Sequence, residues 1–590
     1  MLVGVERITV SGSLSRDDCD MFLRLAAAEY HLGHATEWQH ALVDAHKAAS
    51  KVSDPSIRRK LIADTKAVAG SLMRRHEPHR AISYLSSAID FQETAERALL
   101  LPELYLQRGR ANRDLGRLDD AQNDFERGIQ RLERQRIHTP DVSLRAGIFD
   151  DADELFTDAV SLALSRHDAV GAFGYVERGR ARAMLEEMSS KEGDKSLARP
   201  IAVGALMRAL APGSLLVEYQ ILEDAIAVIV IDHTRVELIR VPRRREVVER
   251  EIQSFIDSLI EYRDKAAIDP ASRTLYEWLL KPLQAQLSRA RSLILVPDAR
   301  LQQLPFAALM NGRTGRYLIE DHLLLTAPSA SIYAGMRHSM PRRPIVPPST
   351  AALFANPFLR GGPFEDLSPL PASEEEVIRI ARMYRRPIVM IGADATVSRF
   401  TSIADACDVV HFAGHTLIRP SEPWHSALLF APDESDGGLL SIQRIARLSF
   451  RNTRVVVLAS CSTLRGHTAG VEGIPSVARA FLVAGVPAVV GTLWDIDDGE
   501  SGPLVATLHA GLARGAPAAH ALRAAQIEAL KSPVVAFRHP SRWAAFVLLS
   551  SVKEPFFTPK RQPTDFGHLP GLSSPDGQAY AHPPPSSAMH

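Results

Sequence analysis

Two residues that could carry covalent chemistry stand at the ends of apolar segments. Cys461 closes the segment VVVLASC, and His415 closes the segment VVHFAGH. A thiol beside an imidazole can lose its proton, attack a carbonyl carbon and have that proton delivered to a leaving amine. The pair therefore fits nucleophilic catalysis, with Cys461 as the nucleophile and His415 as general acid and base.

The order of the segments predicts how the two groups meet. A helix is expected at 441–450, SIQRIARLSF, so the connection is one right-handed crossover between parallel strands. Neighbouring strands lie about 5 Å apart, and the carboxyl ends of parallel strands present reactive groups. We therefore expect imidazole and thiol to face one another across a short cleft. The backbone N–H groups of Gly414, Thr416 and Cys461 are the expected oxyanion donors.

Each residue alone has a simpler interpretation. A cysteine at the end of an apolar strand is usually packing, and a single histidine is usually a hydrogen-bonded structural residue. His411 shares the face of His415 but lies deeper in the strand, so we expect it to be structural. A zinc site that added His467 to these residues is disfavoured, because the spacings match no usual ligand pattern. The sequence contains no GxxxxGK[ST], HExxH or CxxC motif, and we expect no cofactor or metal.

The elements that must position this chemistry belong to an α/β region. Apolar runs alternate with helical segments at 292–298, 350–356, 387–393, 408–415, 453–461 and 486–495. Runs buried on both faces and spaced by helices predict a mostly parallel sheet in a three-layer α/β/α sandwich. The β-branched segments within 214–242 predict a small antiparallel meander before it.

Residues 18–190 are predicted to be entirely helical. Ala41, Ala81 and Ala121 recur every 40 residues, at places where two antiparallel helices would approach closely. The pattern resembles tetratricopeptide (TPR) repeats in a lengthened form; the alternative is a helical bundle with chance spacing. Stacked repeats present an extended concave surface, so we expect a protein or peptide regulator to bind there.

Composition limits the partners and the compartment. The 590 residues include 69 basic and 69 acidic residues, so no global field draws the chain to nucleic acid. Three distant cysteines, Cys19, Cys407 and Cys461, are expected to be free thiols in a reducing cytoplasm. No window is apolar enough for a signal peptide or a membrane span. The lead at 1–17 is left unassigned, and the Pro-rich tail at 553–590 is expected to be disordered.

Several segments, in this order, resemble the CHAT domain, a caspase-like peptidase domain associated with TPR repeats. They are YVERGRARAMLEE, LYEWLLKPL, LILVPDARLQQLPFAAL, LPASEEEV, DVVHFAGH, RVVVLASCST, GVEGIPSVARAFLVAGVPAVVGTLWDIDD and HPSRWAAFVLL. The resemblance covers about 200–552. It implies a caspase-like fold and a cysteine endopeptidase of protein substrates, with the family's histidine at His415 and its nucleophile at Cys461. It also implies regulated proteolysis of the kind found in bacterial defence and programmed cell death.

One departure from the family concerns the residue after the histidine. The family usually has glycine there, and this chain has Thr416. A positive φ at that place would strain a threonine. Thr416 therefore supports a rival interpretation, a caspase-like interaction scaffold without activity. A second rival is a thiol-dependent acyl transferase or hydrolase of small molecules, which a deep closed pocket would favour.

Acidic residues follow the apolar run VPAVVGTLW at the same predicted edge of the sheet. Asp495 is our first candidate for a substrate pocket, and Asp497 is the second. A desolvated carboxylate there would favour Arg or Lys before the scissile bond. The alternative is a solvated acidic loop that caps the next helix.

Overall fold

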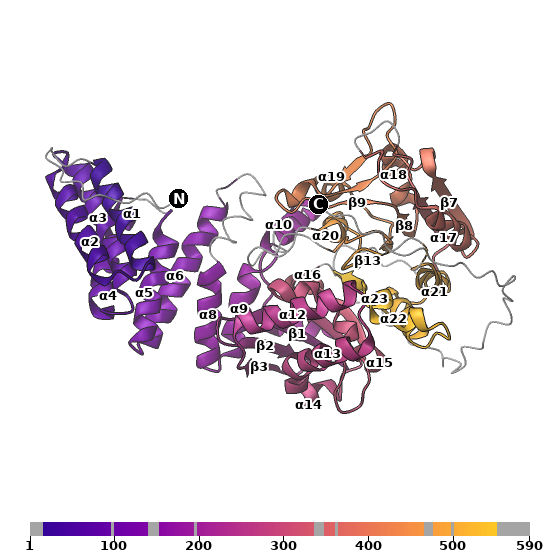
Figure 1. Cartoon of the computed structure of the whole chain (residues 1–590), viewed down its shortest axis with the longest axis horizontal. Helices are drawn as coiled ribbons and strands as arrows, with labels where there is room; N and C mark the ends of the chain where they lie inside the picture. Colours follow the sequence, from indigo (N-terminus) through magenta and orange to yellow (C-terminus); the bar gives the residue numbers. More distant parts are fainter. Residues whose placement is uncertain are drawn as a thin grey trace, which may run out of the picture. The chain divides into compact units, whose positions relative to one another are not determined.

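The computed structural model describes residues 16–551 with several gaps, and Figure 1 shows their arrangement. The gaps are 96–98, 138, 140–152, 194–197, 336–346, 360–363, 465–475, 497–498 and 500. The tail at 553–590 and nearly all of the lead at 1–17 therefore lie outside the described residues.

The N-terminal region is built from antiparallel helix hairpins. The pairs are α1 (Arg16–His31) with α2 (Ala35–Lys51), α3 (Pro55–Met73) with α4 (Pro78–Thr94), α5 (Leu101–Asp114) with α6 (Leu118–Ile137), and α8 (Asp153–Ser165) with α9 (Ala169–Gly179). Helices that are mostly polar on one face and apolar on the other gain their stability by packing in this way. The prediction of an all-helical repeat region is confirmed.

Small residues set how closely the helices of a hairpin cross. A Cβ added to Gly109 in α5 would lie 2.6 Å from the ring of Phe125 in α6. A Cβ added to Gly70 in α3 would lie equally close to Leu85 in α4, at 2.6 Å. Ala121 is fully buried at the same kind of crossing. The repeated small residues therefore mark helix contacts rather than chance spacing.

An 11-stranded sheet forms the centre of the second region. Its strands are β1 (Ser214–Ile221), β2 (Ile226–Ile231), β3 (Val236–Val241), β4 (Ser292–Val296), β5 (Leu323–Thr326), β6 (Thr350–Ala355), β7 (Arg386–Ile391), β8 (Val409–Ala413), β12 (Val455–Leu458), β13 (Ala488–Thr492) and β14 (Phe546–Ser550). They lie in the order β3-β2-β1-β4-β5-β14-β13-β12-β8-β6-β7. β1, β2, β4, β8, β12 and β13 are buried along their whole length, which explains their continuous apolar sequence.

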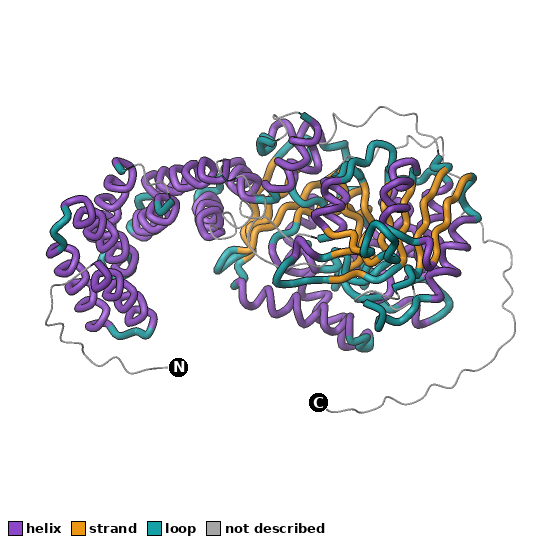
Figure 2. The backbone as a smooth tube through the Cα atoms, turned by 90° about the horizontal axis from the view of Figure 1, so that it is seen from above, coloured by secondary structure: helices purple, strands orange, loops and turns teal. Residues whose placement is uncertain are grey.

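Helices cover both faces of this sheet, as Figure 2 shows. They are α10 (Arg182–Glu192), α11 (Val203–Ala209), α12 (Arg245–Ile260), α13 (Lys265–Leu279), α14 (Gln284–Leu287), α15 (Leu318–Asp321), α16 (Ala330–Gly335), α17 (Pro371–Ala381), α18 (Val397–Ile403), α19 (Ile442–Arg447), α20 (Val477–Val483), α21 (Gly502–Ala513), α22 (Ala518–Leu530) and α23 (Pro540–Trp543). The predicted three-layer α/β/α sandwich with a mostly parallel sheet is confirmed.

The sheet consists of two parallel blocks of opposite direction. β14 is parallel to β5 but antiparallel to β13, so it joins the block of β1, β4 and β5 to the block of β13, β12, β8, β6 and β7. The carboxyl ends of the two blocks therefore lie at opposite edges. The segments within 214–242 pair antiparallel, and β1 continues the large sheet by pairing with β4.

A second, smaller sheet lies within the crossover from β8 to β12. Its strands are β9 (Thr416–Leu417), β10 (Ala427–Leu429) and β11 (Leu439–Ser441), and all pair antiparallel. α19 follows directly, inside the range predicted as helix. The small sheet was not predicted, because strands of two or three residues leave no periodic pattern.

A buried charge cluster connects the end of α9 to the large sheet. The Arg180 guanidinium lies 2.9 Å from the Glu218 carboxylate in β1 and 3.3 Å from Asp298 after β4. It also donates to the Tyr219 carbonyl at 2.7 Å. Burial and the nearby Glu177 carboxylate raise the pKa of Glu218 well above its ordinary value. Few solvent molecules reach this cluster, since Arg180 is only 3% exposed.

Candidate active site

His415 and Cys461 follow the ends of the adjacent strands β8 and β12. The two strands are parallel, and Leu458 pairs with Phe412 in their register. His415 lies two residues beyond the end of β8, and Cys461 lies three residues beyond the end of β12. The strands stay close there, because Ala459 N–H donates to the Phe412 carbonyl at 2.9 Å. Beyond it, the hydroxyls of Thr416 and Ser460 lie 3.0 Å apart.

His415 is partly buried, and one nitrogen of its ring is already engaged. Nε2 lies 2.8 Å from the backbone carbonyl oxygen of Ser368. A carbonyl can only accept, so Nε2 must carry the hydrogen. In the neutral ring, Nδ1 is then the nitrogen with a free lone pair, and it is the atom able to take a proton. Sequence analysis missed Ser368, because a backbone acceptor leaves no residue-type signal.

Cys461 begins a turn just beyond β12. The strand ends at Leu458, three residues earlier than the apolar run suggested, and Ser462 turns the chain with a left-handed φ of +53°. The thiol is partly buried, and Sγ lies 3.9 Å from the Ile496 carbonyl oxygen. Leu464 N–H donates to the Thr492 carbonyl at 2.9 Å, so the turn is tied to the end of β13. The nucleophile candidate is thus held at a strand tip.

The surrounding structure constrains both neighbours of His415, Gly414 and Thr416. Gly414 must lack a side chain, because an added Cβ would lie 2.7 Å from the Phe412 ring and 3.0 Å from Pro357. Thr416 begins β9 and pairs with Leu428, and its φ is not positive. The strain considered for a threonine at this place therefore does not arise.

Of the two acidic residues considered for a substrate pocket, Asp495 lies within the described residues and Asp497 does not. Asp495 is exposed and lies beyond the end of β13, which agrees with the alternative of a solvated acidic loop, and its role in a substrate pocket stays a prediction. Its Oδ1 accepts a hydrogen bond from the Ser462 hydroxyl at 2.6 Å. Asp497 lies outside the described residues, as does His467. The structure thus ties Asp495 to the turn that carries Cys461.

A buried polar chain lies beneath the site, on the strand that carries His415. His411 Nδ1 is 3.1 Å from Nε2 of His509 in α21, and His509 Nδ1 is 2.9 Å from the Tyr384 hydroxyl. On its other side, His411 Nε2 lies 3.1 Å from Oε1 of Glu376 in α17. Burial and the neighbouring His411 lower the pKa of His509 well below its ordinary value, so His509 is neutral at pH 7. We call this set the His411 chain; it fixes β8 to α17 and α21.

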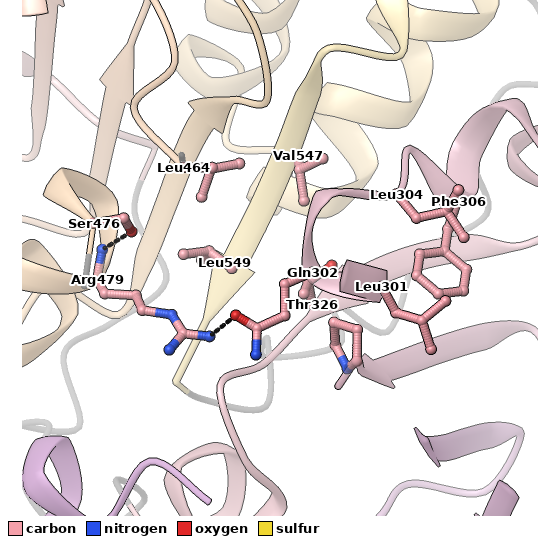
Figure 3. Close-up of a pocket in the computed structure, with 11 residues that line it drawn as sticks. Leu301, Gln302, Leu304, Phe306, Thr326, Leu464, Ser476, Arg479, Val547 and Leu549 are labelled. Atoms are coloured by element: carbon pink, nitrogen blue, oxygen red, sulfur yellow. Dashed lines mark hydrogen bonds between the residues drawn. The ribbon is translucent and has the colours of Figure 1, made fainter. Parts of the chain in front are cut away.

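A small pocket lies near the site but is not lined by the candidate pair. It has a cavity volume of about 30 Å³ and lies beside β5 and β14. Figure 3 shows its lining, which is Pro297, Leu301, Gln302, Leu304, Phe306, Thr326, Leu464, Ser476, Arg479, Val547 and Leu549. Arg479 Nη2 donates to Gln302 Oε1 at 3.1 Å at its rim. The pocket is not the deep closed site that a small-molecule transferase would need around Cys461.

In the part of the chain that the structure describes, no three His, Cys, Asp or Glu side chains lie together as ligands for a metal ion. No described helix combines the length and the apolar character that a membrane span requires.

Comparison with known proteins identifies the second region. Residues 269–551 match the model of the CHAT domain family. The match starts within α13 and ends just after β14, so it includes His415 and Cys461 but not β1, β2 and β3. The predicted range of 200–552 was wider because it included these strands.

Two curated relatives are named for their tetratricopeptide repeats. Human tetratricopeptide repeat protein 28 is 28% identical over 373 residues, which are 53% of this chain and 15% of that protein. The mouse protein of the same name is 27% identical over 340 residues, 50% of this chain and 14% of that protein. The matches thus span only a small part of the length of these relatives.

Solved structures were compared as well. Two crystal structures of the Saccharomyces cerevisiae separase–securin complex, at 2.6 and 3.0 Å resolution, match with TM-scores of 0.46 and 0.48. Both are 10% identical in sequence and cover 91% of this chain and 50% of theirs. Together, the family match and the helix hairpins before it show that this chain carries a CHAT domain behind a TPR-like helical region.

Proposed function

We propose that this chain is a cysteine endopeptidase in which His415 and Cys461 form the catalytic dyad. The observation that carries the proposal is that β8 and β12 are adjacent and parallel, so that His415 and Cys461 follow neighbouring strand ends. The CHAT domain match supports a caspase-like peptidase class. The tie of His415 Nε2 to Ser368 supports it further, because it leaves Nδ1 as a base.

The proposed reaction proceeds in two stages. Cys461 Sγ attacks the scissile carbonyl carbon as its proton passes to Nδ1 of His415, and backbone N–H groups of Gly414, Thr416 and Cys461 stabilise the oxyanion. The imidazolium then gives its proton to the leaving amine as the C–N bond breaks, which leaves a thioester. Water attacks this thioester with His415 as the base, and the new carboxyl group and the thiol are released.

Basic residues are the proposed preference before the scissile bond. Asp495 supplies a carboxylate beside the turn of Cys461, and Asp497 follows it in the sequence. Because Asp495 is exposed and shared with Ser462, its ion pair with a substrate is worth at most about 1 kcal/mol, or about fivefold in preference. The preference should therefore be modest.

Control of this activity is proposed to come from the helical region. Its stacked hairpins offer a surface for a protein or peptide regulator. We assign the protein to the cytoplasm and to regulated proteolysis, of which defence and programmed cell death are the examples that the CHAT resemblance implies.

The test is to incubate the wild type and Cys461→Ala with a cell proteome and to sequence the new N-termini. New termini that follow basic residues should appear with the wild type and vanish in the variant. Cys407→Ala is the matched control, because it removes a buried thiol that is 1% exposed and precedes β8. Identical profiles for wild type and Cys461→Ala would reject the peptidase and favour an inactive interaction scaffold.

A further inference from the structure

The hydrogen-bond acceptor of His415 belongs to a segment that has little burial to hold it. Ser368 lies in residues 364–370, most of which are exposed, just before α17. An exposed loop gains little from apolar packing, so its conformation depends on hydrogen bonds. The question is which group fixes the Ser368 carbonyl at His415 Nε2.

Asn356, the first residue after β6, bridges the segment that contains Ser368 and the strand that precedes His415. Its Oδ1 accepts from the Leu370 N–H at 2.8 Å, two residues beyond Ser368. Its Nδ2 donates to Glu374 Oε1 at 2.6 Å, in the first turn of α17. Its backbone N–H donates to the Ala413 carbonyl at 3.0 Å, two residues before His415. One residue thus contacts both the strand of His415 and the segment of its acceptor.

The backbone of Asn356 shows why the side chain matters. Its φ is +42°, in the left-handed region that glycine adopts without strain and that asparagine tolerates. Glycine would suit this backbone better, but it has no amide group to bridge Leu370 and Glu374. The hydrogen bonds of the side chain, rather than the backbone conformation, therefore explain why this residue is asparagine and not glycine.

Glu374, which accepts the hydrogen bond from Asn356, belongs to a helix that has a second contact with β8. Glu376, two residues after Glu374, contacts His411 of the His411 chain and is buried. The chain connects α17 to β8, the strand that ends before His415. Glu374 therefore reaches Asn356 from a helix that also contacts β8 through Glu376.

We propose that Asn356 is a positioning residue for His415. It holds the Ser368 carbonyl where that oxygen receives the Nε2 hydrogen, and the ring then presents Nδ1 toward Cys461. The consequence for catalysis rests on the proposed peptidase function, but the positioning of the ring does not.

The first test follows the His415 ring directly by NMR of histidine-labelled protein in a Cys461→Ala background. The hydrogen-bonded Nε2–H should give a resonance that His415→Ala removes. We expect Asn356→Gly and Asn356→Ala to abolish that resonance, because the acceptor is no longer held. If Asn356→Gly keeps it, the amide bridge is not what holds the ring and the proposal is wrong.

The second test measures the reactivity of Cys461 with iodoacetamide across pH, without any protein substrate. With Cys461 intact, Asn356→Gly should slow alkylation near pH 7 by about tenfold or more, since a misplaced base deprotonates the thiol less well. Glu374→Ala should act in the same direction, and Glu375→Ala, an exposed neighbour on α17, should not. Equal rates for Asn356→Gly and wild type would contradict a positioning role.

The two proposals fail separately. An absence of Cys461-dependent cleavage would reject the peptidase while the NMR result for Asn356 stood. A retained Nε2–H resonance in Asn356→Gly, with cleavage still dependent on Cys461, would reject only the positioning role. A thermal unfolding curve for each variant shows whether the fold is intact, and relief of the positive φ predicts that Asn356→Gly is no less stable.

Discussion

Buried apolar side chains stabilise both the helix hairpins and the sandwich, but the hairpins add ion pairs near water. Successive hairpins are joined in part by partly exposed ion pairs, among them Arg74 with Asp114 at 2.6 Å and Arg178 with Glu126 at 2.7 Å. The sandwich buries whole strands in apolar surroundings. Ion pairs near water contribute about 0–1 kcal/mol each, whereas each buried large apolar side chain contributes about 1.5–3 kcal/mol.

This difference teaches how the two regions can respond to a partner. Each hairpin contacts mainly its neighbours, so small changes of angle can spread along the stack at low energetic cost. The sheet pairs strands that are distant in sequence, so it changes as a unit or not at all. The joint between them combines continuous apolar packing with the buried ions around Arg180. Substitutions at the joint should therefore change the stability of the chain most.

Arg180→Ala should have the largest effect. It leaves the Glu218 and Asp298 carboxylates buried without their counter-charge, and removal of one partner from a buried ion pair costs about 3–5 kcal/mol. The measurement is the free energy of unfolding of the full chain in urea. The matched control is Arg178→Ala, two residues earlier, whose pairs with Glu126 and Glu133 are partly exposed and should cost about 1 kcal/mol. Equal losses would show that the joint is no more buried than the hairpins.

A change of pH should affect the joint through Asp153, the first residue of α8. Burial and the Asp298 charge raise the pKa of Asp153 to about 6, from 3.8. The folded chain thus holds a proton that the unfolded chain releases, so stability is highest below about pH 4 and falls as the pH rises to about 6. Asp153→Asn should remove about 3 kcal/mol of this dependence. Hydrogen exchange of α8 at pH 4 and pH 7 measures it, and an unchanged slope in the variant would exclude Asp153 as the source.

A matched pair of glycine variants sharpens the account of the hairpins and has the smallest effect. Gly109→Ala forces a Cβ against the Phe125 ring and should destabilise the hairpin by about 1–2 kcal/mol. Gly174→Ala in α9 meets no atom within 4 Å, so it should stabilise its helix by about 0.5–1 kcal/mol. Thermal unfolding followed by circular dichroism compares them. Shifts of the same sign would mean that close helix crossings do not define the repeat.

The sequence predicted those parts of the fold that leave a periodic or continuous pattern. Apolar runs revealed β4, β6, β7, β8, β12 and β13, and helical spacing revealed the hairpins. It did not reveal β5 and β14, because each follows a short helix, α15 or α23, so that its apolar residues read as a continuation of the helical segment. Nor did it reveal that β14 reverses the sheet, since strand direction depends on contacts distant in the sequence.

The site could be predicted only where residue type carries the chemistry. The adjacency of the strands that precede His415 and Cys461 followed from strand order, but the backbone oxygen of Ser368 has no signature in a sequence. Asn356 and Glu374 stand in segments, TAALFAN and LPASEEEV, that were noticed for other reasons. The exposure of Asp495 depends on where β13 ends, and strand ends are poorly defined by apolar patterns.

The place of β14 also bears on how the chain is made. β14 pairs with both β5 and β13, and it is synthesised after every other strand of the sheet. Until then, one edge of β5 and one edge of β13 have no partner strand. At about 5–20 residues per second, the edge of β5 remains unpaired for roughly ten to forty seconds after it is translated. Unpaired strand edges are templates for aggregation. Nascent chains of this protein therefore expose an unpaired strand edge until Phe546–Ser550 emerge and unite the two blocks.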